Sequence, residues 1–396
     1  MLEPAHVGAA HRTAGVQAAS IWLDRWCALR DRLLASPAFQ RTAAAFPLTR
    51  PIARRRARAL FDLCAGFVYS QVLLACVRLR LFDILAEGPQ TVAALSVRLS
   101  LSQEATMRLL CAAVSLRLAA RRGNDRFGLG DLGAALLGNP GIAAMVEHHA
   151  LLYADLEDPV ALLRGERPDT ELARYWAYSR ADRPSALDGE RVAAYSALMS
   201  ASQRLVAGEV LDAYALDGHR CLLDVGGGEA TFIAAAAMRA PHLRLVLFDL
   251  PAVAARAEAR LADTGLADRV RVVGGDFFSD PLPAGADIVS LVRVVHDHDD
   301  AAALALLRAV RRALPADGTL ILAEPMSGTP GAEPIGDAYF GFYLLAMGSG
   351  RPRTPDELET LLQRAGFGHI RRVPTRMPLQ VCLIVARAIG ASVNYA

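Results

Sequence analysis

The 396-residue chain contains no lysine, so all 43 of its Lys and Arg residues are arginines. We attribute this to coding bias and draw no functional conclusion from it. The six cysteines are scattered without a CxxC pair, which argues against a disulfide framework or a zinc site and predicts buried thiols in a reducing cytosol. The formal net charge is only +2, so overall charge gives no reason to expect a polyanionic partner.

Two kinds of long apolar segment are also missing. Residues 1–20 lack a continuous apolar core, so we expect no secretory signal peptide. No run reaches the roughly 20 apolar residues that cross a bilayer, so we expect a protein that is soluble or at most lies on a membrane surface. With 53% hydrophobic and 21% charged residues, a chain of this length predicts two or three globular domains.

The N-terminal third divides into a basic extension and a small helical domain. Residues 1–57 carry an apolar helical stripe from Trp22 to Leu34, and five arginines crowd residues 50–58. A solvated helix face is the ordinary explanation for the arginines. Contact with anionic lipid headgroups is the functional alternative, and nucleic acid is the least favoured.

Residues 58–150 show a winged-helix pattern. The stretch 61–85 is apolar almost all round and is expected to be buried between subunits. Two short helices capped by Thr91 and Ser102 precede a strand, a turn at Gly123 and Asn124, and a second strand. The would-be recognition helix has few polar groups that could reach base edges, so the pattern favours a dimerisation domain and no nucleic-acid partner. Residues 151–215 are a helical connector whose aromatic side chains either pack in the core or roof a pocket.

From residue 216 to 396 the pattern alternates strand and helix. Five β-branched runs and a final pair of strands predict an α/β domain with a Rossmann-like, doubly wound, mostly parallel sheet of seven strands. Such sheets bind ligands beyond the carboxyl ends of their strands, where the strand order reverses. Side chains that bind or react should therefore lie at the strand ends.

The residues at these ends narrow the choice of ligand. Gly226, Gly227 and Gly228 follow the first strand, but Thr231 stands where a nicotinamide fingerprint has its third glycine, and no Gly-Lys-Ser/Thr follows. Asp249 ends the second strand, where a carboxylate can accept hydrogen bonds from ribose hydroxyls of either NAD or S-adenosylmethionine (SAM).

The third to fifth strands end in further polar side chains. Asp276, after the third strand, could bind an adenine amino group or simply cap a turn, and Phe277 could cover the ring. His296 follows the fourth strand where a reacting group would lie, although it could equally be a histidine bonded to neighbouring backbone. Glu324 ends the fifth strand.

Several motifs together resemble the class I SAM-dependent O-methyltransferases of the caffeate and acetylserotonin type. They are DVGGG at 224–228, FDLP at 248–251, GGDFF at 274–278, HD at 296–297 with Asp300 three residues on, AEP at 323–325, and RT at 353–354 before a helix ending in AGF. That family also has an N-terminal winged-helix dimerisation domain, so the resemblance covers about residues 58–388. Residues 36–85 and 288–300 are further similar to its bacterial carotenoid branch, the hydroxyneurosporene and demethylspheroidene O-methyltransferases.

The resemblance implies SAM as cofactor, a homodimer, and a role for each matching residue. Gly226 and Gly228 would let backbone approach the methionine part of SAM, and Asp224 would hold its amino-acid end. The remaining cofactor contacts would be Asp249 with Leu250 at the ribose, Asp276 and Phe277 at the adenine, and Arg293 as a wall. His296 would be the general base and Glu324 a carboxylate beside it.

The sequence departs from the family pattern in two places. Glu229 and Ala230 replace the usual Thr-Gly after the three glycines; Glu229 suits a helix N-terminus, and Ala230 should fit only with a negative φ. Pro352 stands where the plant enzymes place a second Glu before the RT. A clamp of two glutamates on the base is therefore not expected, and Glu324 would act alone.

The chemistry suits these residues. Methyl transfer from a sulfonium is an in-line displacement that gains most from alignment, and a neutral imidazole can take the acceptor's proton. A carboxylate on the other ring nitrogen would fix the tautomer. Because an alkanol is about as weak an acid as water, with a pKa of roughly 16, proton removal should accompany or follow methyl transfer. His296 and His298 alternate with Asp297 and should diverge, so no metal site is expected.

The acceptor is inferred from an apolar segment. Tyr339, Phe340, Tyr343 and Met347 fall on one helical face, which is either ordinary core or the lining of a slot for a polyene. The favoured acceptor is an apolar hydroxylated small molecule, namely the tertiary hydroxyl of an acyclic carotenoid. A phenol, a polyketide and a bacteriochlorophyll precursor are the alternatives, and a SAM-sensing winged-helix regulator is the non-enzymatic one. The expected location is the cytoplasm, or peripherally on the inner, photosynthetic membrane.

Overall fold

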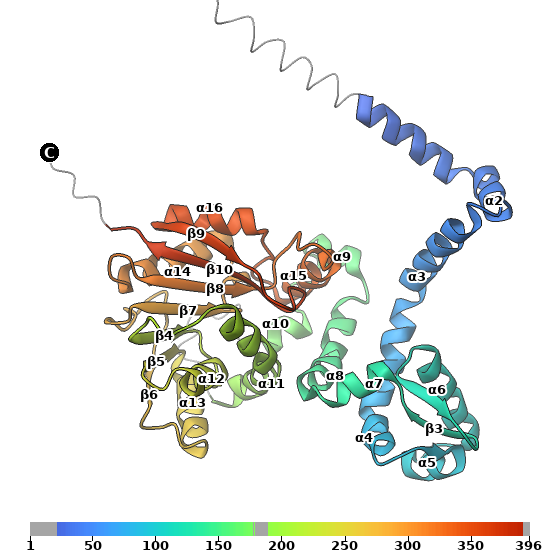
Figure 1. Cartoon of the computed structure of the whole chain (residues 1–396), viewed down its shortest axis with the longest axis horizontal. Coiled ribbons are helices and arrows are strands. Elements are labelled where there is room, and N and C mark those ends of the chain that lie inside the picture. Colours follow the sequence, from blue (N-terminus) through green and yellow to red (C-terminus); the bar gives the residue numbers. More distant parts are fainter. Residues whose placement is uncertain (1–21, 177, 179–188, 391–396) are drawn as a thin grey trace, which may run out of the picture. The chain divides into compact units, whose positions relative to one another are not determined.

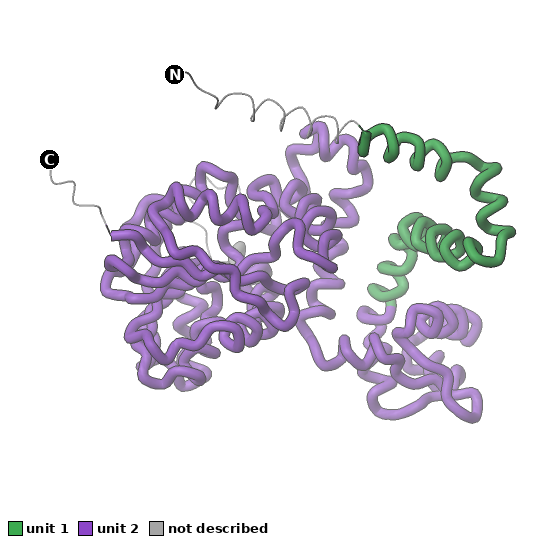
Figure 2. Tube along the Cα trace, turned by 45° about the horizontal axis from the view of Figure 1, so that its top comes forward, with its two compact units in different colours: residues 1–75 green, residues 76–396 purple. Residues whose placement is uncertain are grey.

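A computed structural model describes residues 22–176, 178 and 189–390 of the chain, which form two compact units, residues 1–75 and 76–396 (Figures 1 and 2). The division expected from sequence, at residues 57, 150 and 215, stays a prediction.

The described part of the first unit is helical, and almost none of its side chains are buried. A helix over residues 22–35 is followed by α2 (Pro37–Ala45), which Ser36 caps by accepting from the Phe39 amide, and by the first part of α3 (Arg50–Arg78). No residue from 22 to 73 is fully buried. By length and composition, α3 is apolar enough to cross a membrane, contrary to the sequence expectation. The sequence expectation was based on the lack of an uninterrupted apolar run, whereas α3 is long and apolar on average although it contains the charged Asp62. The core helix of a soluble protein can be equally long and apolar.

The second unit begins with the expected winged helix. Its elements are α4 (Leu81–Ala86), β1 (Gln90–Thr91), α5 (Val92–Leu99), α6 (Gln103–Ser115), β2 (Ala119–Arg122), β3 (Arg126–Leu129) and α7 (Asp131–Leu137). The strands form an antiparallel sheet in the order β1-β3-β2. Thr91 and Ser102 cap α5 and α6 as predicted, accepting from the amides of Ala94 and Ala105 at 3.2 and 3.1 Å.

Among the described residues, four helices connect this part to the large sheet. They are α8 (Pro140–Asp155), α9 (Pro159–Leu163), α10 (Glu171–Tyr175) and α11 (Gly189–Ala213). Helix α8 packs against α10 and α11, and α11 in turn packs against helices that cover the sheet. The connector is therefore part of the body that surrounds the sheet.

The predicted doubly wound sheet is confirmed. Its strands are β4 (Cys221–Val225), β5 (Arg244–Asp249), β6 (Val270–Gly274), β7 (Ile288–Val292), β8 (Thr319–Glu324), β9 (Phe367–Val373) and β10 (Cys382–Ala388). They run in the order β6-β5-β4-β7-β8-β10-β9, with β10 antiparallel to both neighbours and the other pairs parallel. The strand order reverses between β4 and β7, which places a binding crevice at their carboxyl ends.

Helices cover both faces of this sheet (Figure 1). They include α12 (Thr231–Arg239), α13 (Pro251–Asp263), α14 (Asp300–Ala313) and α16 (Pro355–Ala365), while a π-helix η4 (Pro334–Phe340) and α15 (Gly341–Met347) follow β8. Successive residues of β4 enter different cores: Leu222 lies in one apolar cluster and Leu223 in the other. Burial on both faces explains why the strands read as continuous apolar runs.

Candidate active site

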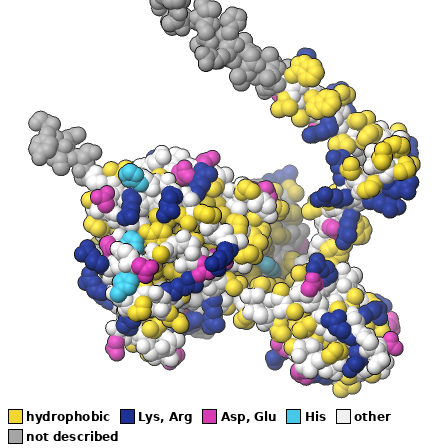
Figure 3. Space-filling model, in the orientation of Figure 1, with side chains coloured by type: hydrophobic (Ala, Val, Ile, Leu, Met, Phe, Trp, Pro, Cys, Tyr) yellow, Lys and Arg dark blue, Asp and Glu magenta, His cyan; other side chains and the backbone are white. Residues whose placement is uncertain are grey.

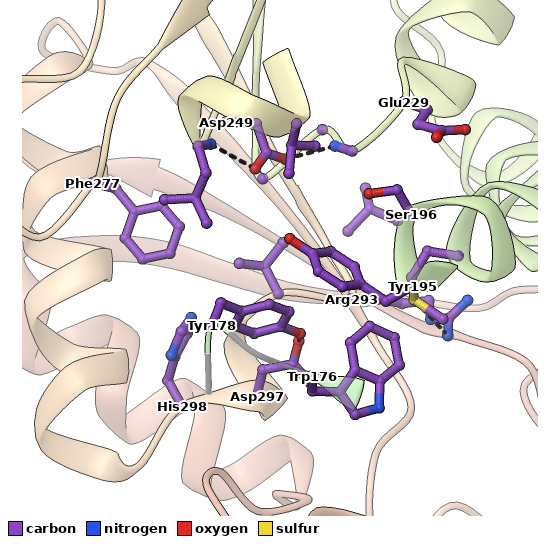
Figure 4. A pocket seen from close by; sticks show the side chains of 18 of the residues that line it. Trp176, Tyr178, Tyr195, Ser196, Glu229, Asp249, Phe277, Arg293, Asp297 and His298 are labelled. Carbon is purple, nitrogen blue, oxygen red and sulfur yellow. Dashed lines mark hydrogen bonds between the residues drawn. The ribbon is translucent and has the colours of Figure 1, made fainter. Parts of the chain in front are cut away.

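A cavity of about 470 Å³ opens at the carboxyl ends of the parallel strands, at the reversal of strand order (Figure 4). Seven of the eight predicted cofactor residues line it, and they come from the ends of β4, β5, β6 and β7. These are Gly226, Gly228, Asp249, Leu250, Asp276, Phe277 and Arg293. The structure thus gathers into one wall residues that lie up to 67 positions apart in the chain.

The turn after β4 requires its glycines. Gly226 and Gly228 have φ values of +69° and +56°, in the left-handed region that side chains rarely adopt. A Cβ on Gly226 would lie 2.8 Å from a methyl group of Val294, and one on Gly227 would lie 2.8 Å from Asp224 Oδ2. The bare backbone of this turn can therefore approach a ligand closely.

Asp224, the eighth predicted cofactor residue, lies beneath this turn rather than in the cavity wall. Its Oδ1 accepts a 2.6 Å hydrogen bond from Ser290, whereas its buried Oδ2 has no hydrogen-bond partner in the described part of the chain. Burial raises the pKa of this carboxyl to about 7. An unsatisfied carboxylate oxygen under a glycine turn would favour a ligand that brings positive charge or donors.

Asp249 stands at the end of β5 with its carboxylate held by backbone. Its Oδ2 accepts from the amide of Gly228 at 2.8 Å, and its Oδ1 accepts from the amide of Leu250 at 2.7 Å (Figure 4). Despite these bonds, burial raises the pKa of Asp249 to about 6. Each oxygen keeps further lone pairs, so the carboxylate is oriented and can still accept from paired hydroxyls.

The far wall of the cavity is aromatic. Phe277 packs its ring on Phe278 at 4.7 Å between centroids and on His298 at 5.5 Å. Beside it, Asp276 accepts from the amide of Phe278 at 2.9 Å, so its predicted capping role and its place in the cavity wall coexist. Together these residues place the Phe277 ring beside a carboxylate in the cavity wall, a combination that suits a purine ring.

Glu229 and Ala230, which form the first departure from the family pattern, behave differently from each other. Ala230 has a φ of +64°, so the expectation of a negative φ is wrong: the turn keeps the geometry of glycine and imposes it on alanine. Glu229 lines the cavity and is held by two arginines of α13, Arg256 at 2.6 Å and Arg260 at 3.2 Å. Sequence reasoning missed this pairing, because nothing in the local pattern links residue 229 to the next helix.

His296 is buried between two carboxylates. Its Nδ1 is hydrogen-bonded to Glu324 Oε2, while Glu324 Oε1 accepts from the amides of Val294 and Val295 at 3.0 and 2.7 Å. Its Nε2 lies 3.2 Å from Asp297 Oδ1. Burial by itself lowers the pKa of the imidazole, but the charges of Asp297 and Glu324 outweigh it and raise the pKa above its ordinary value. The next residue in the chain, Asp297, therefore places a second carboxylate beside the ring.

The segment 349–353 fixes the backbone of the His296 loop. Arg351 donates its amide to the His296 carbonyl at 3.0 Å, and a Cβ on Gly350 would lie 2.1 Å from that oxygen. The fully buried Arg353 donates to the carbonyls of Val295 and His298 at 3.0 and 2.7 Å. The RT motif thus holds the strand end that carries the histidine, and Pro352 lies between the two arginines.

The connector supplies an aromatic roof, which is one of the two alternatives that the sequence left open for these side chains. Trp176, Tyr178 and Tyr195 line the cavity opposite Asp249 (Figure 4). Tyr178 donates a 2.8 Å hydrogen bond to Asp297 Oδ2, so this roof contacts the carboxylate beside the histidine. Core packing was the default interpretation of these aromatics because wall and core residues share the same composition.

The four residues predicted to line a substrate slot do not line this cavity. Tyr343 and Met347 are buried in a core cluster, where the Tyr343 hydroxyl bonds to His148 and Trp176 at 2.7 and 2.8 Å. Tyr339 and Phe340 are half-buried. Phe340 lies 5.8 Å from the His296 ring, edge to face. The single helical face assumed from sequence is interrupted, because residues 334–340 form a π-helix with a different period.

Comparison with known proteins agrees with this geometry. Residues 61–139 match the O-methyltransferase dimerisation domain and residues 153–368 match the O-methyltransferase domain. Demethylspheroidene O-methyltransferase of Cereibacter sphaeroides is 47% identical over 90% of this chain and 93% of its own length, and that of Rhodobacter capsulatus is 40% identical over 86% and 84%. The crystal structure of CalO1, a methyltransferase of calicheamicin biosynthesis with S-adenosylhomocysteine bound, superposes with a TM-score of 0.68, covering 84% of this chain and 98% of that one at 27% identity.

The chain belongs to the SAM-dependent O-methyltransferases. It is an enzyme that transfers a methyl group to oxygen, its cofactor is SAM, and the match to the dimerisation domain supports a homodimer. The cavity fits that cofactor: the glycine turn leaves room for backbone approach, Asp249 is oriented for a ribose, and the unsatisfied Asp224 oxygen suits the cationic end of the molecule.

Proposed function

We propose that this enzyme methylates the tertiary hydroxyl of a hydroxylated acyclic carotenoid. The observation that carries the proposal is the 47% identity over 90% of the chain to a demethylspheroidene O-methyltransferase, repeated at 40% in a second species. The aromatic roof formed by Trp176, Tyr178 and Tyr195 supports the proposal, because contact of an apolar acceptor with such a wall is more favourable than contact with water.

Each cofactor residue has a proposed task. Asp224 and the backbone of Gly226 and Gly228 would hold the methionine part of SAM, Asp249 beside Leu250 the ribose, and Asp276 with Phe277 the adenine. Arg293, which donates to Ser202 at 2.9 Å and has a φ of +60°, would form the remaining wall. Bound SAM supplies an electrophilic methyl group, and the protein's part is to align the acceptor oxygen with it.

His296 takes the acceptor's proton in this proposal. Glu324 holds Nδ1–H, which leaves Nε2 as the site that must be free to accept. In the structure Nε2 faces Asp297, so the hydroxyl would take over that position while Tyr178 retains the other Asp297 oxygen. The O–H bond breaks as the O–CH₃ bond forms, because the alkanol is too weak an acid to ionise first.

The acceptor's apolar chain is proposed to run along Tyr339 and Phe340. Phe340 already packs on the His296 ring, and the Tyr339 hydroxyl is hydrogen-bonded to His149 at 2.8 Å. Tyr343 and Met347 would then support this wall from the core. Burial lowers the pKa of His148 to about 4, so this histidine is neutral at pH 7 and can accept from Tyr343.

We also propose that the enzyme is cytoplasmic and associates peripherally with the inner membrane. An acyclic carotenoid dissolves in lipid rather than in water, and the arginines of residues 50–58 are largely exposed.

The acceptor is tested by incubating purified enzyme and SAM with a hydroxylated acyclic carotenoid and, separately, with simple phenols, followed by mass spectrometry. The expected result is one added methylene on the carotenoid only. Efficient methylation of a phenol with none on the carotenoid would contradict the proposed acceptor, while SAM binding without any transfer would favour a regulator.

A further inference from the structure

The first 37 described residues, 22–58, form a segment that we call the N-terminal arm. None of its residues is fully buried, and it lies before residue 61, where the match to the dimerisation domain begins. Short helices are marginal in water and gain most of their stability by burying an apolar face. The arm therefore has an apolar face that the described residues of its own unit do not bury.

That face runs along the helix of residues 22–35. Trp22, Trp26, Leu29 and Leu33 follow one another at spacings of three or four residues and share one side of the helix. The two tryptophans are 73% and 59% exposed. The face continues beyond α2 in a further exposed set, Phe46, Leu48 and Ile52. Figure 3 shows hydrophobic and basic side chains side by side along this segment.

The arm also concentrates the positive charge of the molecule. It contains nine arginines and two aspartates, a net charge of +7, whereas the whole chain carries only +2. Arg54, Arg55 and Arg56, at the start of α3, are all exposed. An amphipathic helix with tryptophans on one side and a basic cluster next to it has the composition of segments that lie in the headgroup region of a bilayer.

We propose that the N-terminal arm docks on an anionic lipid bilayer, with Trp22 and Trp26 at headgroup depth and the arginines against the lipid phosphates. A second copy of the arm is a poorer cover, because a two-fold symmetric contact would bring +7 against +7. This inference deepens the peripheral association proposed above and does not depend on which acceptor the active site takes.

Flotation of the purified full-length enzyme with vesicles tests the arm. Vesicles of phosphatidylcholine alone are compared with vesicles that also contain phosphatidylglycerol, at low and high salt. Binding is expected only with the anionic lipid and should weaken as salt rises. The combined change Arg54→Gln, Arg55→Gln and Arg56→Gln should lower the partition coefficient roughly a hundredfold, since each arginine near the surface contributes about fivefold.

Matched variants separate docking from a general loss of charge or fold. Arg308→Gln, Arg312→Gln and Arg364→Gln together remove the same charge from exposed positions on α14 and α16 and should leave flotation unchanged. Trp22→Ala with Trp26→Ala should abolish flotation, whereas Met238→Ala, another exposed apolar position, should not. All variants should bind SAM as the parent does, which shows that they are folded.

Three results would overturn the proposal. Equal binding to neutral and anionic vesicles would remove the role of the arginines. Retention in the membrane after alkaline carbonate would indicate insertion, for which α3 is long and apolar enough, rather than docking. A tryptophan variant that turns from dimer to monomer while its flotation is unchanged would assign the arm to a second copy of the chain. Failure of carotenoid methylation would leave the proposal untouched.

Discussion

Gly226 and Gly228 lie two residues apart in the same turn and have similar backbone angles, yet they meet different surroundings. Gly228 faces open space, whereas Gly226 faces Val294. Ala230, which follows in the left-handed region, shows that the turn can force an L-residue into this conformation. Adding a methyl group therefore has two distinct costs: backbone strain at both glycines, and steric overlap at Gly226 alone.

We predict that Gly228→Ala lowers the free energy of unfolding by about 1 kcal/mol, the cost of a left-handed L-residue, in urea titrations without cofactor. Gly226→Ala should lose about 2 kcal/mol, because overpacking against Val294 adds to the same strain. Val294→Ala removes the methyl groups that the new Cβ would meet. In that background, Gly226→Ala should therefore cost only the backbone strain, as Gly228→Ala does. Equal losses for the two glycines would mean that the overlap relaxes freely.

The second residue-scale prediction concerns the base. His296→Ala should abolish most turnover and leave SAM affinity nearly unchanged, because the imidazole lies outside the cavity wall that holds the cofactor. Asp297→Asn should lower the raised pKa of His296 and move the acidic limb of kcat/KM to lower pH, since the base form is populated only above that pKa. Asp263→Asn, an exposed aspartate on α13, is the control. An unmoved limb would show that Asp297 does not set the titration.

The third residue-scale prediction concerns the two carboxyls at the cofactor turn, those of Asp224 and Asp249. Asp224 and Asp249 have pKa values raised to about 7 and about 6, so part of their population is protonated near neutrality. Only the ionised forms suit the cationic end and the hydroxyls of SAM. Calorimetry should therefore show affinity for SAM rising about tenfold from pH 6 to pH 8, with proton release on binding. Asp224→Asn should flatten this rise, and a parent enzyme with pH-independent affinity would argue against the assignment.

At the scale of elements, the position of the His296 loop depends on the segment 349–353, which precedes α16. Arg353 is buried and donates to two carbonyls of the loop and to the Asp300 carboxylate, whereas Arg351 contacts the same carboxylate from a half-exposed position. Arg353→Gln is expected to cost about 3 kcal/mol of unfolding free energy and most of kcat. Arg351→Gln should cost less than about 1 kcal/mol. Similar losses in thermal unfolding would show that burial of Arg353 does not matter.

The same scale shows what the sequence could predict. The strands of the large sheet and their polar ends were predictable, because burial on both faces leaves continuous apolar runs and parallel order brings their ends together. Thr91 and Ser102 were recognisable as caps because capping is local. For the connector aromatics Trp176, Tyr178 and Tyr195, the sequence left core and roof as alternatives, since only tertiary packing decides whether an aromatic side chain faces a core or a cavity. The second carboxylate at His296 was sought at a distant position, 352, when the neighbouring Asp297 supplies it.

At the scale of the whole molecule, the match to the dimerisation domain directs attention to α3. Leu63 and Phe67 lie one helical turn apart on it and are 81% and 69% exposed in the single chain. Leu63→Glu with Phe67→Glu should shift the dimer to monomer in light scattering, because burying two carboxylates there would cost ~3 kcal/mol or more. Leu379→Glu with Met238→Glu changes exposed apolar positions elsewhere and should leave the dimer intact. A stable dimer in the first variant would place the interface on another surface.

The bare N-terminal arm has a practical consequence for anyone handling the enzyme. Eight of its nine arginines are fully exposed, and trypsin cleaves after arginine except where proline follows, as at Arg50. Trypsin would shorten an uncovered arm by successive cleavages, whereas an arm bound to its partner would resist cleavage. The time course of its loss in a crude extract would thus report, without any label, whether the arm has found its partner.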